Sequence, residues 1–496
     1  MNRQIRLVGV GIMVLFVGLF LQLNWLQIVH APALEANPLN SLGVVKEYTA
    51  PRGDIVSADG VTLADSVPTN DEYKYLRQYP TGALFEDITG FFSFTYGSDG
   101  VERTYDQVLT GSNSPFKLPT SLSQLRTLLT DHNRTQSITL TALDKLQKVA
   151  QAELAGREGS VVALDPRTGA ILAMYSNPSF NPNLLSGHDQ TTVQASYKAL
   201  SATPGIFSPG AYRQRWFPGS TFKIITASAM YDHQPALVTK VFPTLSALPL
   251  PDTTNLLHNF GGEVCGGALL ELFTVSCDTG FGQVGLDLGA NSLNDEATSF
   301  GFDQTPPIDL PFAAQSYFPT AASFAQDVPG VAYSAIGQQD VQATPLEMAM
   351  VAGAIANGGT MMTPHVLGHV TNAQSQVVST YQPKPWLQAT SAATAAQLTQ
   401  LMVSVVDRGT GVAARIPGVA VAGKTGTAQT GTGETDDWFA AFAPAAAPTI
   451  AVAVVLPNQP SADEYQGGTL AAPIVKAMIE AYLGGGTAPV PPSTAP

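Results

Sequence analysis

The sequence is short of cysteine and of charged side chains, above all basic ones. Its 496 residues include two cysteines and 12% charged residues, and 24 Lys and Arg against 38 Asp and Glu give a formal net charge of −14. Two cysteines are too few for a disulfide scaffold or a four-ligand zinc site. An acidic chain has no broad positive field to attract a phosphate backbone, so the composition argues against a nucleic-acid partner.

The sequence does have enough apolar bulk to fold. Hydrophobic residues make up 45% of the chain, which excludes the high-charge, low-apolar composition of disordered proteins. The length allows about two to four domains. No glycine-rich nucleotide loop precedes a helix at the right spacing, so the sequence predicts no cofactor and no metal.

One long apolar run follows Arg3 and Arg6. It extends from Leu7 to Ile28 and, at about 1.5 Å per helical residue, is long enough to cross a bilayer core of about 30 Å. Ala31–Ala33 resembles a signal-peptide cleavage site, but the apolar part of a signal peptide has about 7 to 15 residues, so an uncleaved anchor is favoured. No Lys or Arg follows until Lys46. This asymmetry predicts a single-pass plasma-membrane protein whose folded part is extracellular.

The remaining pattern predicts an α+β protein. A loop-rich α+β module comes first, and a capping-box pattern at Thr141 and Asp144 predicts the start of a helix. The chain between two groups of strands is Ala-rich and helical in character, and an apolar helix is expected over 472–483. The expected strands are Ser160–Leu164, Ala170–Tyr175, Val419–Gly423, Trp438–Phe442 and Thr449–Leu456. Strands, then helices, then strands of the same sheet is an α+β layout.

Ser220 and Lys223 form a Ser-x-x-Lys pair. On a helix the two side chains share a face. Desolvation would lower the pKa of the lysine so that it could accept the serine proton, and the helix N-terminus would offer N–H groups to an oxyanion. A second match, Ser114–Lys117, contains a proline in a Gly-, Ser- and Asn-rich stretch, so we interpret it as a chance occurrence.

Lys424-Thr425-Gly426-Thr427 follows the expected strand Val419–Gly423. Lys424 could attract a carboxylate, the two threonines offer hydroxyls, and the small Gly426 would let a substrate backbone lie against the strand. The backbone N–H of Thr427 could join that of Ser220 as an oxyanion donor. Alone, such a tetrapeptide is typical of an exposed turn. The upstream Ser-x-x-Lys pair makes a functional interpretation the better one.

The order Ser-x-x-Lys, Ser-x-Asn, Lys-Thr-Gly is the signature of penicillin-binding proteins and class A β-lactamases. Over nearly its whole length the chain resembles the class B penicillin-binding proteins, and among these the actinobacterial members most. Besides the catalytic motifs, the resemblance rests on Pro51–Ile55, Asp165–Pro166 through Ser176–Pro178, Phe217–Gly219, Ile336–Gln338 through Thr344–Pro345, and Asp437–Phe439.

The resemblance implies a fold with an antiparallel five-stranded sheet flanked by helices, an N-terminal pedestal domain of the dimerisation type and one transmembrane helix. The expected divisions are a cytoplasmic start and anchor at 1–30, the non-catalytic pedestal at 31–155, the transpeptidase domain at 156–485 and a disordered tail at 486–496.

The activity implied by the resemblance is D-Ala-D-Ala transpeptidation in cell-wall synthesis during division or growth. Ser220 would attack the penultimate D-Ala carbonyl of a peptidoglycan stem peptide, and an amine of a neighbouring stem peptide would resolve the acyl-enzyme. β-Lactams would acylate the same serine. The catalytic set would be Ser220, Lys223, Ser276 and Lys424, with Asp278, Thr425, Gly426 and Thr427 binding substrate. The implied partners are a glycosyltransferase and other division or elongation proteins.

The middle motif departs from the family because Ser276-Cys277-Asp278 has Asp where the family has Asn. A literal Ser-x-Asn, Ser292–Asn294, follows a loop signal at Gly289–Asn291, and we reject it on context. An Asn amide both donates and accepts, whereas an ionised Asp only accepts. Asp278 near Lys223 would favour the charged lysine and oppose its use as a base. The substitution therefore suggests slow or specialised acylation.

The sequence leaves two questions open. Cys265 and Cys277 could pair in an oxidising compartment, but the sequence does not give their separation. The function also has alternatives. Water in place of an amine would make the protein a carboxypeptidase or β-lactamase, with Glu263 or Glu434 available as a base. A non-catalytic scaffold or β-lactam sensor is the alternative from a different class.

Overall fold

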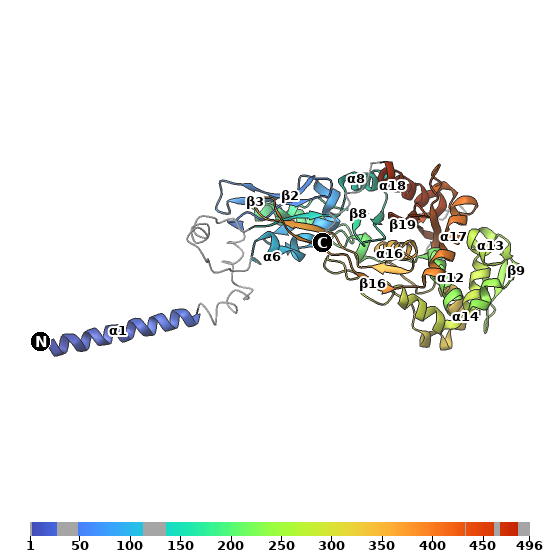
Figure 1. Cartoon of the computed structure of the whole chain (residues 1–496), viewed down its shortest axis with the longest axis horizontal. Helices are drawn as coiled ribbons and strands as arrows, with labels where there is room; N and C mark the ends of the chain where they lie inside the picture. Colours follow the sequence, from blue (N-terminus) through green and yellow to red (C-terminus); the bar gives the residue numbers. More distant parts are fainter. Residues whose placement is uncertain (1, 27–47, 113–134, 432, 461–466, 485–496) are drawn as a thin grey trace, which may run out of the picture.

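The computed structural model describes residues 2–26, 48–112, 135–431, 433–460 and 467–484, arranged as Figure 1 shows. Three features singled out in the sequence lie outside the described residues: Ala31–Ala33, the second Ser-x-x-Lys match at Ser114–Lys117, and the predicted tail 486–496.

The N-terminal helix α1 (Asn2–Trp25) begins with a short polar stretch that includes Arg3 and Arg6 and is mostly apolar from Leu7 on. Its segment Arg6–Trp25 has a mean hydropathy of 2.2, and none of its residues is buried. Among the described residues it is the one helix long and apolar enough to cross a membrane. The predicted span Leu7–Ile28 begins within this helix, and Ile28 lies outside the described residues.

A five-stranded antiparallel sheet forms the centre of the C-terminal part, in the order β17-β18-β19-β7-β8. Every residue of β19 from Ile450 to Pro457 is buried, so both faces of the strand are covered. This explains why the strands read as apolar runs rather than alternating ones. The strands are β7 (Gly159–Leu164), β8 (Ile171–Asn177), β17 (Ala422–Gln429), β18 (Glu434–Ala443) and β19 (Ile450–Pro460).

Helices cover this sheet, as the sequence predicts. Helix α8 (Asp144–Leu154) packs on β8 and on α18 (Ala472–Gly484), which in turn packs on β19, whereas α16 (Pro345–Ala356) packs on β19, β7 and β18. A helical region lies at the end of the molecule away from α1 (Figure 1) and contains α12 (Lys223–Asp232), α13 (Leu269–Thr274), α14 (Asp278–Ser299) and α17 (Ala392–Arg408).

Two local predictions were wrong. The capping box at the start of α8 does not form, because the Thr141 hydroxyl donates to the Ile171 carbonyl, and a distant carboxylate, Asp59, accepts from the Asp144 N–H at 2.9 Å instead. The expected strand Val419–Gly423 is also displaced. Strand β17 begins at Ala422 and continues to Gln429, since its polar half pairs with β18 as far as Thr435. The Lys-Thr-Gly-Thr motif therefore lies within the strand.

A second sheet, the pedestal sheet, has six strands in the order β15-β14-β6-β1-β2-β3. Strands β14 and β15 come from the C-terminal part of the chain and pair antiparallel, and β14 pairs with β6. A hairpin from residues 367–380 therefore completes the sheet. The strands are β1 (Ile55–Val56), β2 (Thr62–Pro68), β3 (Tyr75–Gln78), β6 (Ser137–Leu140), β14 (Leu367–Thr371) and β15 (Val377–Thr380).

A buried ion network supports the pedestal sheet. Glu102, which is fully buried, accepts from Arg52 Nε at 3.0 Å and from Arg77 Nε at 2.6 Å, and the Tyr79 hydroxyl donates to it at 3.2 Å. The two arginines hold the pKa of Glu102 below its ordinary value although burial acts to raise it. Arg52 also pairs with Asp106 at 2.7 Å, whereas Glu102 is the carboxylate that compensates the buried charge of Arg77.

We therefore predict that Glu102→Ala lowers the free energy of unfolding by about 3 to 5 kcal/mol, because it removes the carboxylate that pairs with the buried Arg77 and leaves Arg52 with Asp106 alone. Urea titration of the full chain in detergent measures this change. Glu480→Ala is the control, since its partner Lys476 lies 4.0 Å away on the surface, and such exposed pairs contribute at most about 1 kcal/mol. Equal effects of the two substitutions would contradict the prediction.

Candidate active site

Ser220 lies in the short 3-10 turn η3 (Gly219–Phe222), which leads directly into α12. The segment before it is attached to β18: the Phe217 N–H donates to Asp436 at 3.2 Å, and the Trp438 indole N–H donates to the Phe217 carbonyl at 2.8 Å. Residues 223–230 of α12 are all buried. The predicted loop running into a buried helix is thus present, and it fixes the direction in which Ser220 points.

Lys223 Nζ lies within hydrogen-bonding distance of three acceptors from one other segment. Its Nζ lies 2.7 Å from the Ser276 carbonyl, 3.3 Å from Ser276 Oγ and 2.6 Å from Asp278 Oδ1. The lysine side chain is fully buried, and that of Asp278 is 15% exposed. The predicted contact between the unusual aspartate and the catalytic lysine is therefore made.

Ser276 connects the two lysines of the site. Lys424 Nζ, from strand β17, donates to Ser276 Oγ at 2.8 Å, while Lys223 approaches the same oxygen from α12. Ser276 adopts a left-handed backbone conformation, with φ of 62°, in the turn between α13 and α14. Three segments far apart in the sequence thus meet at one hydroxyl.

The cluster contains two amines, those of Lys223 and Lys424, and one carboxylate, that of Asp278. Burial lowers the pKa of Lys223 from its ordinary value, and the adjacent Asp278 opposes that shift. Burial lowers the pKa of Lys424 well below its ordinary value, the nearby Lys223 lowers it further, and Asp278 opposes both. Amines with a lowered pKa can exchange protons with a serine near neutral pH.

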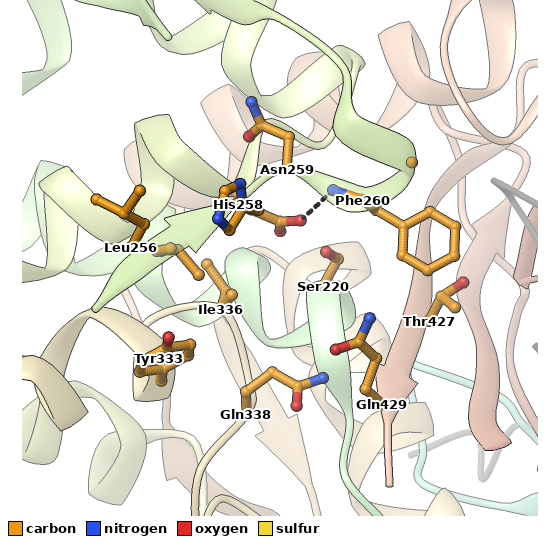
Figure 2. Close-up of a pocket in the computed structure, with 13 residues that line it drawn as sticks. Ser220, Leu256, His258, Asn259, Phe260, Tyr333, Ile336, Gln338, Thr427 and Gln429 are labelled. Carbon is orange, nitrogen blue, oxygen red and sulfur yellow. Dashed lines mark hydrogen bonds between the residues drawn. The ribbon is translucent and has the colours of Figure 1, made fainter. Parts of the chain in front are cut away.

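Ser220 opens into a cavity of about 470 Å³ (Figure 2). One wall comes from the segment 256–261, another from Tyr333, Ile336 and Gln338, and a third from Thr427 and Gln429 of β17. A smaller cavity of about 40 Å³ adjoins Ser220 and is lined by Glu263, Thr410 and Thr425, among others. A cleft with a few convergent polar groups is typical of a substrate site.

The structure gives a different reason for Gly426 from the one predicted. A Cβ at this position would lie 2.6 Å from the Pro218 carbonyl oxygen and 3.0 Å from Thr221 Cγ2. The glycine therefore allows the Ser220 segment to pack directly against β17. Its predicted contact with substrate stays a prediction, as do those of Thr425 and Thr427. The Thr425 and Thr410 hydroxyls share a hydrogen bond at 2.6 Å, and the Thr427 hydroxyl accepts from the Gly467 N–H at 3.2 Å.

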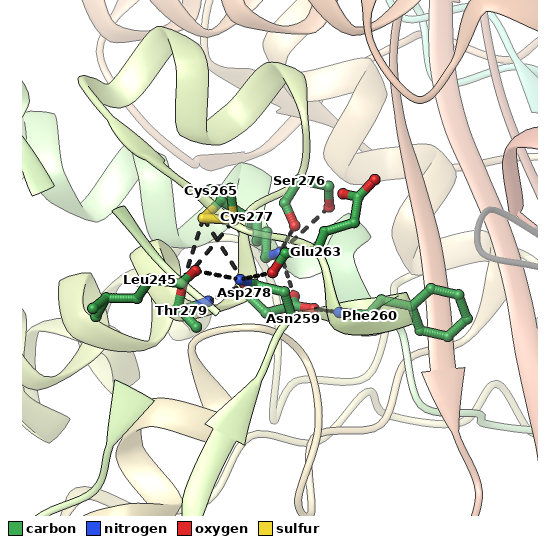
Figure 3. Close-up of a disulfide and its surroundings, with 10 residues drawn as sticks. Leu245, Asn259, Phe260, Glu263, Cys265, Ser276, Cys277, Asp278 and Thr279 are labelled. Atoms are coloured by element: carbon green, nitrogen blue, oxygen red, sulfur yellow. Dashed lines mark hydrogen bonds and ion pairs between the residues drawn. A yellow bond between two sulfur atoms is a disulfide. The ribbon is translucent and has the colours of Figure 1, made fainter. Parts of the chain in front are cut away.

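Cys265 and Cys277 form a disulfide with Cα atoms 5.8 Å apart (Figure 3). The bond joins strand β12 (Cys265–Gly267) to the residue before Asp278. The literal Ser-x-Asn lies elsewhere: Asn294 is in the second half of α14, beyond a kink at Gly289, and donates to the Pro319 carbonyl. The choice of Ser276–Asp278 as the middle motif agrees with this geometry.

Sequence reasoning missed the residues that line the cavity from the segment 256–261, above all Asn259 and Phe260. It also missed Asp436, whose buried carboxylate holds the Ser220 segment and whose pKa burial raises to about 6. The one available signal was Asp436 beside the motif Asp437–Phe439. Nothing in the pattern around Phe260 indicates a site, because its place depends on long-range contacts.

Comparison with known proteins identifies the class that these features define. The family model for the penicillin-binding protein transpeptidase domain matches residues 159–480, and that for the penicillin-binding protein A dimerisation domain matches residues 52–137. Both models describe parts of penicillin-binding proteins, which are serine acyl-transfer enzymes.

Named relatives align with almost the whole chain. The peptidoglycan D,D-transpeptidase PbpA of Mycobacterium tuberculosis is 36% identical over 98% of this chain and 100% of its own length, and that of Mycolicibacterium smegmatis is 38% identical over 97% and 99%. A solved imipenem acyl-enzyme complex of M. tuberculosis penicillin-binding protein A matches with a TM-score of 0.79, covering 88% of this chain and 100% of that one. The chain belongs to the class B penicillin-binding proteins.

We predict that Gly426→Ala slows acylation of Ser220 by about 10²-fold, because a shift of about 1 Å in a catalytic segment costs that much. The added methyl must displace the Pro218 carbonyl. Stopped-flow acylation with a fluorescent penicillin measures the rate. Gly187→Ala is the control, since a Cβ there meets only Val193 Cγ2 at 3.5 Å. An unchanged rate in Gly426→Ala would show that the close approach is unimportant.

The pH dependence of acylation should report on Lys223. If the neutral amine accepts the serine proton, the rate rises with pH through the pKa of Lys223. Asp278 acts to raise that pKa, so Asp278→Asn lowers it, and the rising limb should move to lower pH. Acylation rates between about pH 5 and pH 10 test this. A limb that stays in place or moves to higher pH means that Asp278 does not control the proton on Lys223.

Proposed function

We propose that this protein is a peptidoglycan D,D-transpeptidase in which Ser220 is the acylated residue. The observation that carries the proposal is the contact chain Lys223–Ser276–Lys424, whose central Ser276 lines the smaller cavity together with Ser220. Ser220 Oγ attacks the penultimate D-Ala carbonyl and gives up its proton, the C–N bond to the terminal D-Ala breaks, and that D-Ala leaves with a proton on its nitrogen. The product is an acyl-enzyme ester.

The proton moves among the three polar groups of the cluster. Lys223 accepts the serine proton when its amine is neutral, and Ser276 passes a proton between the two lysines to the leaving nitrogen. The backbone N–H groups of Ser220 and Thr427 stabilise the oxyanion of the tetrahedral intermediate. Support for these donors comes from the position of Ser220 in the turn that begins α12 and of Thr427 in β17 opposite it.

An amine of a neighbouring stem peptide then attacks the ester carbon. The new amide forms, the bond to Ser220 Oγ breaks, and the serine regains its proton. β-Lactams acylate the same serine, in keeping with the imipenem acyl-enzyme of the M. tuberculosis relative. Water could replace the amine, and Glu263 lines the smaller cavity beside Ser220, so rapid hydrolysis is one outcome that an experiment must distinguish.

We also propose that α1 anchors the protein with the catalytic part outside the cell. The apolar helix and the preceding Arg3 and Arg6 support this orientation. The disulfide between Cys265 and Cys277 suits an oxidising compartment. The proposed partners are a glycosyltransferase and other proteins of division or elongation, docked through the anchor and the pedestal.

The test is intact-mass analysis of the purified full chain in detergent after exposure to a fluorescent penicillin. We predict a stable adduct on the wild type and on Ser114→Ala, the second Ser-x-x-Lys match, and none on Ser220→Ala. A stable adduct supports a transpeptidase, whereas rapid turnover of the penicillin indicates a β-lactamase. No adduct on the wild type would favour a non-catalytic scaffold and overturn the proposal.

A further inference from the structure

Asp278 uses both of its carboxylate oxygens, and the two oxygens face different parts of the site. Oδ1 accepts from Lys223 Nζ at 2.6 Å, while Oδ2 accepts from the backbone N–H of Phe260 at 3.3 Å (Figures 2 and 3). One side chain thus contacts the catalytic lysine and the wall of the cleft. Asp278 is the first residue of α14 and directly follows the disulfide-bonded Cys277.

The wall it contacts is the cleft segment, residues 256–263. Phe260 lines both the large and the small cavity beside Ser220, and Figure 2 shows its ring extending across the cleft toward Thr427. Its neighbour Asn259 holds the segment from below: its amide donates to the Leu245 and Glu263 carbonyls, at 2.8 and 2.9 Å. Phe260 is therefore part of the wall of both cavities that Ser220 lines.

The cleft segment meets the start of α14 at two adjacent points. Asn259 Oδ1 accepts from the Thr279 N–H at 2.8 Å, and the Phe260 N–H donates to Asp278. The first contact needs only the backbone of α14 and survives any side chain at position 278. The second requires an acceptor on that side chain.

An amide cannot replace the carboxylate in both contacts. Asn has one acceptor oxygen and one donor NH₂. If the oxygen of an Asn at position 278 faced Lys223, its NH₂ would face the Phe260 N–H, and two donors would oppose each other. If it were turned round, the NH₂ would face the Lys223 ammonium. Only a carboxylate satisfies both donors at once.

We propose that Asp278 is a positioning residue that couples closure of the cleft segment over Ser220 to the charged state of Lys223. The proposal rests on the function proposed above and deepens it. The ion pair keeps a proton on Lys223, which slows proton transfer from Ser220, while the bond to Phe260 holds the wall against the substrate. The aspartate thus favours non-covalent binding and opposes the chemical step.

Because Asp278 contacts both Lys223 and Phe260, Asp278→Asn should weaken non-covalent binding of penicillin and at the same time speed the acylation step. Loss of one charge-assisted hydrogen bond to the wall should weaken non-covalent binding of penicillin about tenfold, which is about 1.4 kcal/mol. Release of Lys223 from its counter-ion should raise the first-order acylation rate about three- to tenfold.

The experiment uses the full chain in detergent and a fluorescent penicillin in stopped flow, with the concentration dependence separating the dissociation constant from the acylation rate. Asp287→Asn is the matched control, because it removes the same charge from the same helix, where Asp287 pairs with Lys240 near the surface. It should change neither constant. Phe260→Ala should weaken binding like Asp278→Asn without raising the acylation rate.

Hydrogen exchange gives a second readout that needs no acylation. The Phe260 amide should exchange about tenfold faster in Asp278→Asn than in the wild type, because its acceptor is lost. The Thr279 amide, held by Asn259, should keep its protection. Three results would each overturn the coupling: tighter penicillin binding together with faster acylation in Asp278→Asn, weaker binding together with slower acylation, or an unchanged exchange rate of the Phe260 amide.

The two proposals can fail separately. If Ser220→Ala still forms the adduct, the assignment of Ser220 is wrong, whatever the exchange rate of Phe260. If the adduct depends on Ser220 but the Phe260 amide is equally protected in the Asp278→Asn variant, the transpeptidase stands and the coupling by Asp278 is wrong.

Discussion

The site depends on a buried ion pair between Lys223 and Asp278, whose charged atoms lie 2.6 Å apart. Two fully buried amines, Lys223 and Lys424, lie around one serine hydroxyl. Two positive charges at such a place would be very costly, because burial penalises each charge and the charges repel. A single carboxylate at the same place balances one amine and leaves the other to lose its proton. Burial lowers the pKa of both lysines, and Asp278 opposes this shift for each of them.

The fold brings three segments that are distant in the sequence to this cluster. Ser220 and Lys223 come from a turn and helix that Asp436 and Trp438 attach to β18. Lys424 comes from the edge strand β17, and Gly426 lets that strand approach the turn closely. Ser276 and Asp278 come from the turn before α14, next to the disulfide. Each segment is held by contacts away from the reacting groups, so its position does not depend on the polar contacts within the cluster.

Sequence patterns predicted what is local and repetitive. The central strands were predictable because strands buried on both faces read as apolar runs, and the family was predictable because the residue types and order of its motifs are specific. The same approach missed the end of β17, since Lys424 to Gln429 is polar and becomes a strand only by pairing with β18. It misjudged the start of α8 because Asp59, far away in sequence, supplies the cap. The place of Phe260 in the cleft could not be predicted for the same reason, because it depends on contacts with residues far away in the sequence.

The substitution of Asp for Asn in the middle motif changes both the charge and the hydrogen-bonding capacity of the side chain beside Lys223. With an amide, the group beside Lys223 is neutral, and its NH₂ can donate to a substrate. With a carboxylate, that donor is gone, the lysine gains a counter-ion, and the second oxygen takes the Phe260 N–H. Both oxygens of Asp278 are thus occupied by donors of the protein itself, and an ionised carboxylate at this position has no hydrogen to donate to a substrate.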